Sequence, residues 1–334
     1  MQVIRGRDNL KHGARPRAVC VGAFDGFHLG HQYLLNRLCA LAGERDFDSG
    51  IVTFEPPPKQ FFAPPDEPPQ RLITLEERIA LAASLCCNVM AVLDFDADLA
   101  AWPADRFISE VLATGLGTRI LVASSTHTMG HERADIGRIT ALCAAHGIEV
   151  VEPPIMQLAD LRINSSAIRQ ALWDGRVEVA ANILGRHYSF AGQVTPGRGI
   201  GRELGFPTAN IMPPAEKLIP KDGVYAGLAT EETPEAMAQA WPAAISIGSA
   251  PTFEHGETLI EAHLLAEDVP DLSGHVLRLE FVHYLREQRK FDSPQELAGQ
   301  IAADVQRTRE LCHALKPGSG FGTVAPFCPH AERS

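Results

Sequence analysis

Apolar residues recur in two alternating patterns along the first half of the chain. Continuous apolar runs at residues 17–21 and 50–54 have the length and composition of buried strands, and the amphipathic stretch 32–43 between them has helical spacing. The alternation continues with expected helices at 75–85, 104–113 and 135–146 and expected strands at 89–93, 119–122 and 149–152. Strands that alternate with helices of this length predict an α/β fold with a doubly wound, mostly parallel sheet.

The pattern changes in the second half. After a helical segment at residues 165–184, short β-rich runs separated by Gly and Pro clusters are expected at 190–194, 224–228, 244–247, 260–265 and 276–283. This even spacing predicts an antiparallel barrel or sandwich. A closing amphipathic helix is expected over 293–315, with Ser293 as its N-cap and Glu296 three residues later. Beyond residue 316 the Gly, Pro and Ser content predicts a loose tail.

Composition narrows the class of protein. A chain of 334 residues predicts about two domains. Its 45% hydrophobic and 21% charged residues exclude a disordered or fibrous protein. The net charge of −11, from 30 basic and 41 acidic residues, opposes non-specific nucleic-acid binding. No apolar window could span a bilayer and the first residues lack a secretion signal, so we expect a cytoplasmic protein with no nucleic-acid or membrane partner. The oligomeric state stays open.

The cysteines do not predict a disulfide framework or a metal site. They are Cys20, Cys39, Cys86, Cys87, Cys143, Cys312 and Cys328. Their number is odd, no pair has Cys-x-x-Cys spacing, and the adjacent Cys86 and Cys87 could bridge only with strain. We therefore expect reduced thiols that pack mostly in the core.

The sequence GAFDGFHLGHQ, residues 22–32, lies between an expected strand and an expected helix. Its glycines allow a ligand to approach the backbone, and His28 and His31 share one face of the first helical turn. Imidazoles and free N–H groups at a helix start suit the phosphates of a nucleotide. A glycine-rich turn with incidental histidines is the alternative, and the H-x-G-H spacing directly after a strand favours the phosphate site. The further nucleotide-binding candidates here are Gly22, Phe24, Asp25 and Gly30.

A second glycine-rich sequence, GQVTPGRGIGRELGFPTANI, covers residues 192–211. Glycines interleaved with arginines form a basic loop that can wrap phosphates. In the PTAN sequence that follows, Thr208 and Asn210 are two apart on an extended strand. Their side chains therefore project to one face and can share a Mg²⁺ ion and its phosphates. The candidates in this stretch are Gly197, Gly201, Arg202, Gly205, Pro207, Thr208 and Asn210 for the nucleotide, the last two also for the metal.

These motifs resemble a known family. The H-x-G-H segment resembles the nucleotidylyltransferases, in which this motif holds the phosphates of ATP. The sequences at 53–62, 71–85 and 163–169 look like those of bacterial bifunctional riboflavin kinase/FAD synthetases (FMN adenylyltransferases). In that family the last of these blocks supplies two serines and an arginine to the ATP phosphates. The resemblance therefore implies this role for Ser165, Ser166 and Arg169.

The second half resembles riboflavin kinases. The matching sequences are at 192–211, 221–227, 243–253, 260–265 and 280–291. In this family the glutamate of the IEAHLL block is the general base, which implies that role for Glu261.

The resemblance covers residues 19–311. It implies a Rossmann-like nucleotidylyltransferase domain at 1–184, a six-stranded antiparallel riboflavin kinase barrel with a C-terminal helix at 185–315, and a flexible tail at 316–334. The implied substrates are riboflavin, FMN and ATP, with Mg²⁺. The implied reactions are phosphorylation of riboflavin to FMN and adenylylation of FMN to FAD.

The departures from the family are concentrated in the first domain, with a smaller one at Ser273 in the barrel. Pro57 stands where relatives carry a histidine. In the segment 123–129, Ala123 replaces a glycine, Ser125 an Asp or Asn, and Thr126 and Thr128 two aromatic residues. Three interpretations follow: a FAD synthetase with a divergent pocket, an enzyme for another acceptor, or a scaffold for a kinase of riboflavin or an analogue. The preserved phosphate residues argue against a scaffold. They also argue against a flavin-binding protein without catalysis.

Overall fold

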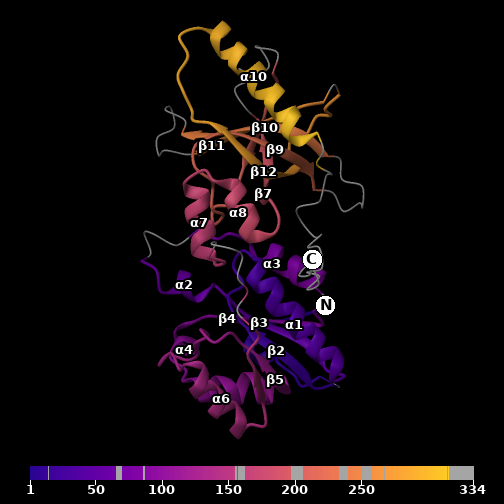
Figure 1. The fold of residues 1–334 in the computed structure, drawn as a ribbon, viewed down its shortest axis with the longest axis vertical. Helices are drawn as coiled ribbons and strands as arrows, with labels where there is room; N and C mark the ends of the chain where they lie inside the picture. Colours follow the sequence, from indigo (N-terminus) through magenta and orange to yellow (C-terminus); the bar gives the residue numbers. More distant parts are fainter. Residues whose placement is uncertain are drawn as a thin grey trace, which may run out of the picture. The chain divides into compact units, whose positions relative to one another are not determined.

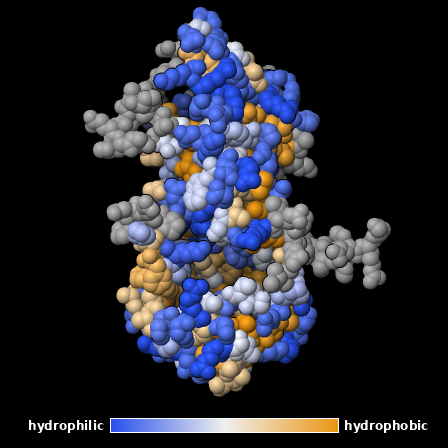
Figure 2. Space-filling view, turned by 60° about the vertical axis from the view of Figure 1, so that its left-hand side comes forward, coloured by the Kyte–Doolittle hydropathy of each residue, from blue (hydrophilic) through white to orange (hydrophobic). Residues whose placement is uncertain are grey.

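The structure is a computed structural model that describes residues 1–13, 15–64, 70–85, 87–154, 156, 162–196, 206–232, 240–249, 258–266, 268–313 and 315. These residues form two compact units. Unit 1 includes residues 1–163, and unit 2 begins at Asn164. Figure 2 shows hydrophilic residues over most of the visible surface of both units, in accord with the normal globular composition.

Unit 1 contains a six-stranded sheet of parallel strands in the order β1-β4-β3-β2-β5-β6. The strands are β1 (Gln2–Arg5), β2 (Arg17–Val21), β3 (Asp48–Glu55), β4 (Val89–Asp94), β5 (Thr118–Val122) and β6 (Glu149–Val151). The helices are η1 (Arg7–Asn9), α1 (Leu29–Glu44), α2 (Pro58–Phe61), α3 (Leu75–Ser84), α4 (Ala97–Ala100), α5 (Ala104–Phe107), η2 (Ile108–Gly115) and α6 (Ile136–Ala145).

The winding of the sheet defines where a ligand can bind. The chain steps from β2 through β3 to β4 in one direction and then crosses to β5 and β6 on the other side of β2. Right-handed crossovers then place α1 and α3 on one face and α6 on the other, as Figure 1 shows. The switch point of the sheet lies between β2 and β5, and the carboxyl ends of strands at such a point are the usual ligand site. The predicted doubly wound sheet is confirmed.

Unit 2 is a closed six-stranded barrel in the order β10-β11-β8-β7-β12-β9. Its strands are β7 (Tyr188–Thr195), β8 (Ala209–Met212), β9 (Gly223–Glu231), β10 (Ala240–Ser249), β11 (Thr258–Leu264) and β12 (Val276–Arg286), all antiparallel. Its helices are α7 (Ser165–Trp173), α8 (Val177–Leu184) and α10 (Pro294–Cys312). Helix α10 packs on β9, β10 and β12, and α8 on β7 and β12 (Figure 1). The predicted barrel and C-terminal helix are confirmed, including the Ser293 cap, whose side chain accepts a hydrogen bond from the Glu296 N–H.

Several details differ from the sequence-based elements. The expected helix at 104–113 is α5 followed by the π-helix η2. The expected helical segment at 165–184 is two helices, because Gly175 adopts φ +77° between them. Both of these helices belong to unit 2. The predicted domain boundary at 184/185 stays a prediction, and the predicted tail lies outside the described residues.

Candidate active sites

The turn between β2 and α1 is held in an unusual backbone conformation. Phe24 (φ +50°) and Phe27 (φ +45°) lie in the left-handed region with Gly26 (φ +87°) between them. Residues other than glycine occupy this region at a cost in conformational free energy. Such strained residues cluster at functional sites. Burial of both rings, 1% and 0% exposed, offsets this cost. The turn therefore presents the start of α1 at the switch point in a fixed conformation.

His28 and His31 lie together at that helix start, as the sequence predicts. His28 is the N-cap of α1, and its Nδ1 accepts a hydrogen bond from the His31 N–H at 3.3 Å. The two rings stack with centroids 3.6 Å apart, and the edge of the His31 ring meets Phe24 at 5.1 Å. A side chain at Gly30 would come within 3.2 Å of the His28 Nδ1. The helix dipole and the two imidazoles thus favour an anion at one point.

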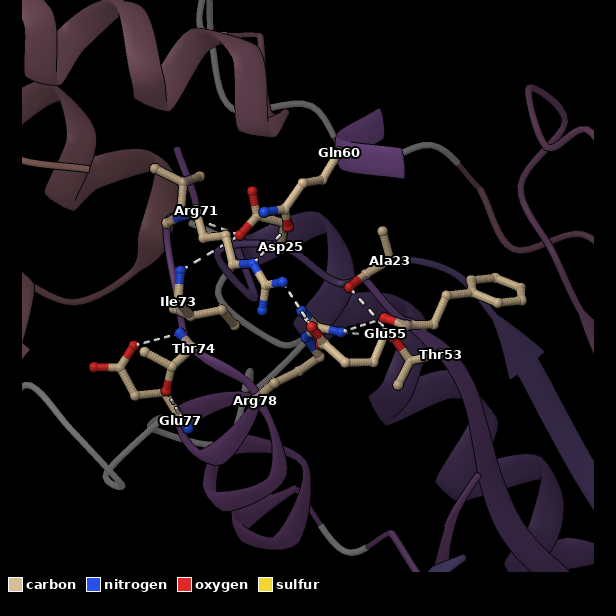
Figure 3. Close-up of polar contacts among 12 residues, drawn as sticks. Ala23, Asp25, Thr53, Glu55, Gln60, Arg71, Ile73, Thr74, Glu77 and Arg78 are labelled. Atoms are coloured by element: carbon tan, nitrogen blue, oxygen red, sulfur yellow. Dashed lines mark hydrogen bonds and ion pairs between the residues drawn. The ribbon is translucent and has the colours of Figure 1, made fainter. Parts of the chain in front are cut away.

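Asp25, a predicted nucleotide-binding residue, connects this turn to the segment before α3. It is 7% exposed, and its Oδ1 accepts hydrogen bonds from the N–H groups of Leu72 and Ile73, at 3.0 and 3.3 Å (Figure 3). The hydroxyl of Thr53 donates to the Ala23 carbonyl at 3.4 Å. These contacts give Asp25 a role in holding the turn, and its nucleotide-binding role stays a prediction.

Two buried arginines converge on Glu55 at the carboxyl end of β3, which the sequence analysis did not single out (Figure 3). Arg71 lies 2.6 Å from the Glu55 carboxylate, and its Nε donates to the Gln60 side chain of α2 at 2.8 Å. Arg78 is fully buried, and its Nη1 donates to the Thr53 hydroxyl and the Phe54 carbonyl, both at 3.1 Å. This network fixes α2 and α3 to the carboxyl ends of the strands, where a ligand is expected.

Replacement of Arg78 by methionine is expected to lower the free energy of unfolding of unit 1 by ~1–3 kcal/mol, because the Thr53 hydroxyl and the Phe54 carbonyl lose their buried donor while Glu55 keeps Arg71. Thermal unfolding of the variant measures the change. Arg45→Met is the control, since Arg45 is half exposed, and its ion pair with Glu149 is worth at most ~1 kcal/mol. Equal melting temperatures for the two variants would contradict the expectation.

A cluster of phenylalanines covers the carboxyl ends of β3 and β4. Phe95 contacts Phe54, Phe61 and Phe62 with ring centroids 5.5, 5.3 and 5.8 Å apart. Phe61 and Phe62 are 37% and 68% exposed. This partly exposed aromatic surface suits a flat ring system. The sequence analysis missed it because its members come from separate elements, although the adjacent Phe61 and Phe62 in a proline-rich stretch were a signal.

The segment after β5, where the family aromatics are absent, forms a polar turn. Ser124 and Thr126 share a hydrogen bond between their hydroxyls at 3.2 Å. Within the described part of the chain, the Nε2 of His127 is buried and has no hydrogen-bond partner. Burial lowers the pKa of His127, so its imidazole is neutral at pH 7. This segment adds hydroxyls and one neutral imidazole beside the switch point.

Ser165, Ser166 and Arg169 lie in the first turns of α7, whose N-cap Asn164 accepts a hydrogen bond from the Ala167 N–H at 2.8 Å. They belong to unit 2, whereas His28 belongs to unit 1. A common phosphate site of these residues with the histidines stays a prediction.

In the barrel, Glu261 and Asn210 face each other directly. β11 and β8 pair in a register that sets Glu261 across from Asn210, and the neighbouring strands extend the row to Thr195 and Ser246. These four residues lie on one face because directly paired residues do so. The alternate residues, including Ile211, Ile260 and Ala262, point inward and are buried. The barrel therefore carries a half-exposed polar row on its outer face.

The oxygen atoms of this row fit a hard divalent cation. The Asn210 amide in the row and the hydroxyl of Thr208, two residues before it, are oxygen donors that Mg²⁺ accepts, and the Glu261 carboxylate across from Asn210 is left for another role. The row ends at Ser246, whose hydroxyl accepts a hydrogen bond from Gln288 at 2.8 Å. The predicted phosphate residues Gly197, Gly201, Arg202 and Gly205 lie outside the described residues. In the part of the chain that is described, no group of three His, Cys, Asp or Glu residues is placed to hold a metal ion.

A doubly wound sheet with H-x-G-H at its switch point, followed by a closed barrel with a polar row, defines a class of protein: a nucleotidylyltransferase unit joined to a flavokinase unit. The family model described as FAD synthetase matches residues 10–167, and the one described as riboflavin kinase matches residues 184–312. The chain is 33% identical over 313 residues to a bifunctional riboflavin kinase/FMN adenylyltransferase of Pseudomonas fluorescens, with 93% of this chain and 98% of the relative covered. The protein of the same name from Escherichia coli K12 is 32% identical, with 95% and 100% covered. The chain belongs to the family of bifunctional riboflavin kinase/FMN adenylyltransferases.

A solved structure agrees with this fold over nearly the whole chain. A crystal structure from Streptococcus pneumoniae, described as a macrolide-efflux protein, has a TM-score of 0.84 at 26% identity and covers 92% of this chain. The match covers 99% of the Streptococcus pneumoniae chain. No helix in the described ranges is both long and apolar enough to cross a membrane.

Proposed function

We propose that the barrel transfers the γ-phosphoryl group of ATP to riboflavin, giving FMN, and that unit 1 joins AMP from ATP to FMN, giving FAD and pyrophosphate. The observation that carries the first step is the register that sets Glu261 across from Asn210. The second step is supported by the stacked histidines at the switch point and the adjacent phenylalanine cluster. Membership in the bifunctional family supports both.

In the kinase step, the Glu261 carboxylate accepts the proton of the ribityl 5′-hydroxyl as its oxygen attacks the γ-phosphorus. The bond from that phosphorus to the bridging oxygen breaks, and ADP leaves. Thr208 and Asn210 would hold Mg²⁺, which supplies charge neutralisation on the ATP phosphates when bound. Phosphoryl transfer needs mainly such positioning and neutralisation.

In the adenylylation step, a phosphate oxygen of FMN attacks the α-phosphorus of ATP and pyrophosphate leaves. Negative charge develops on the oxygens around that phosphorus. His28, His31 and the N–H groups at the start of α1 stabilise this charge. Ser165, Ser166 and Arg169 would add hydroxyls and a guanidinium to the phosphates.

The phenylalanine cluster supports a flavin as the acceptor. Phe62 and Phe61 present partly exposed rings at the same sheet edge as the histidines. Stacking on such rings is worth ~0.5–1.5 kcal/mol per pair beyond burial. They supply aromatic surface in a chain that carries Thr126 and Thr128 where relatives have aromatic residues. This observation favours adenylylation of FMN over a kinase joined to a scaffold.

A product assay tests the proposal. Protein incubated with Mg²⁺, ATP and riboflavin is expected to form FMN and then FAD, and protein given FMN in place of riboflavin is expected to form FAD. Chromatography separates the three flavins. FMN from riboflavin with no FAD in either tube would leave only the kinase, and neither FMN nor FAD in the first tube would overturn the kinase assignment. A cytoplasmic localisation, where ATP is available, is part of the same proposal.

A further inference from the structure

Thr208, which would share Mg²⁺ with Asn210, lies just outside the hydrogen-bonded ladder of the barrel. β8 begins at Ala209 and pairs with β11 through Ala209 and Asn210. Asn210 is also paired with Thr195 of β7, so backbone pairing on both sides holds it. Thr208 has no such pairing among the described strands. Its position depends on contacts other than the ladder.

His263 makes such a contact. Its Nδ1 lies 2.8 Å from the carbonyl oxygen of Pro207, the residue immediately before Thr208. Because a carbonyl oxygen only accepts, the Nδ1 carries the hydrogen and donates it. The ring of His263 also meets the ring of Phe206 edge to face, with centroids 5.5 Å apart. One side chain thus holds Phe206 and Pro207, the two residues immediately before Thr208.

The same histidine lies on the face of β11 that carries the proposed general base. Glu261 and His263 are two apart on one strand and therefore point the same way. Ala262 and Leu264 alternate with them and are buried in the barrel. Continuing the antiparallel register by one pair sets His263 across from Thr208. A side-chain bond therefore takes the place of the backbone pairing where the ladder stops.

We propose that His263 is a positioning residue of the kinase site, whose hydrogen bond to Pro207 holds the Thr208 hydroxyl in place for Mg²⁺ and the ATP phosphates. The inference rests on the proposed kinase function of the barrel. His263 acts through the backbone of Pro207 and not by contact with the reacting atoms. Its loss should therefore weaken Mg·ATP binding more than it slows the proton transfer to Glu261.

Two substitutions separate the hydrogen bond from the ring. His263→Phe keeps the aromatic contact with Phe206 and removes the donor. It is expected to raise the KM for Mg·ATP about tenfold, as one lost hydrogen bond does, with a much smaller change in kcat. His263→Asn places an amide N–H near the position of Nδ1, and it is expected to restore most of the lost affinity. His275→Phe is the matched control, because that histidine contacts Glu231 elsewhere on the barrel.

A double-mutant cycle tests whether His263 acts through Thr208. If it does, His263→Phe should cost little in a protein that already carries Thr208→Ala. A histidine that only stabilises the barrel would add its full effect in both backgrounds. Riboflavin binding, followed by fluorescence quenching, and FAD formation from added FMN check that both units remain folded. If His263→Phe loses riboflavin binding, His263→Gln replaces it in the cycle. The glutamine amide lies one methylene further along the side chain than that of asparagine, so it does not take the place of Nδ1.

The outcomes are distinct. A wild-type protein that forms neither FMN nor FAD from riboflavin would overturn the kinase function itself. With an active wild-type protein, an unchanged KM for Mg·ATP in His263→Phe would overturn the role of His263. So would a His263→Asn variant as weak as His263→Phe, or full additivity with Thr208→Ala. A raised KM that His263→Asn restores and Thr208→Ala masks would establish it.

Discussion

Replacement of Glu261 by glutamine will lower the rate of FMN formation by ~10²–10⁴-fold, the usual contribution of a general base. Glutamine has nearly the same shape and can keep the place opposite Asn210, but it cannot accept the proton of the ribityl hydroxyl. Steady-state assay of riboflavin phosphorylation at saturating Mg·ATP measures the loss. The effect should fall on kcat, because Glu261 is assigned to proton transfer and not to binding the flavin.

Two controls accompany this variant. Glu310→Gln changes an exposed glutamate of α10 that pairs with Arg307, and it should phosphorylate riboflavin at the wild-type rate. FAD formation from added FMN should persist in Glu261→Gln, since that reaction is assigned to unit 1. A Glu261→Gln protein with normal turnover would remove this residue from its role.

Replacement of His28 by asparagine will lower the rate of FAD formation by ~10²–10³-fold, the cost of losing one preorganised group at the developing charge. Asparagine is a good N-cap, so its side chain can still accept the hydrogen bond from the His31 N–H and keep α1 intact. The substitution therefore removes the imidazole without removing the cap. Conversion of FMN to FAD, followed by chromatography, measures the change.

The cap also supplies the control for this experiment. His28→Ala loses both the imidazole and the cap, so it should show a lower melting temperature than His28→Asn but a similar loss of FAD formation. Riboflavin phosphorylation should be unchanged in both variants. If His28→Asn formed FAD at the wild-type rate, the histidine would serve the turn and not the reaction.

Local sequence patterns predicted most of the fold. Buried strands such as β2 and β4 are continuous apolar runs, and their bounds agree with the expected ones to within about a residue. β1 was not expected, because a four-residue strand with one buried side chain has too little pattern to detect. The π-helical end of α5 was also invisible, since its apolar spacing is that of an ordinary helix.

In the candidate sites, contacts between residues close in sequence were predicted, and contacts between separate elements were not. His28 and His31 are close in sequence, so spacing alone predicts that they meet. The pairing of Asn210 with Glu261 joins residues about fifty positions apart, and only the strand register places them together. The arginines on Glu55 and the contact of Phe95 with Phe62 join separate elements in the same manner. Such contacts arise from tertiary packing and leave no periodic signal.

Closure of the barrel gives each of its strands two hydrogen-bonded neighbours. An open sheet can fray from its outermost strand, but a closed one has no such strand, so β8 and β11 are each held from both sides. The amide protons beside Asn210 and Glu261 should therefore exchange with solvent more slowly than those of an edge strand. Heat would then end phosphoryl transfer in one cooperative step, together with the melting of the unit, rather than by gradual loosening of the site.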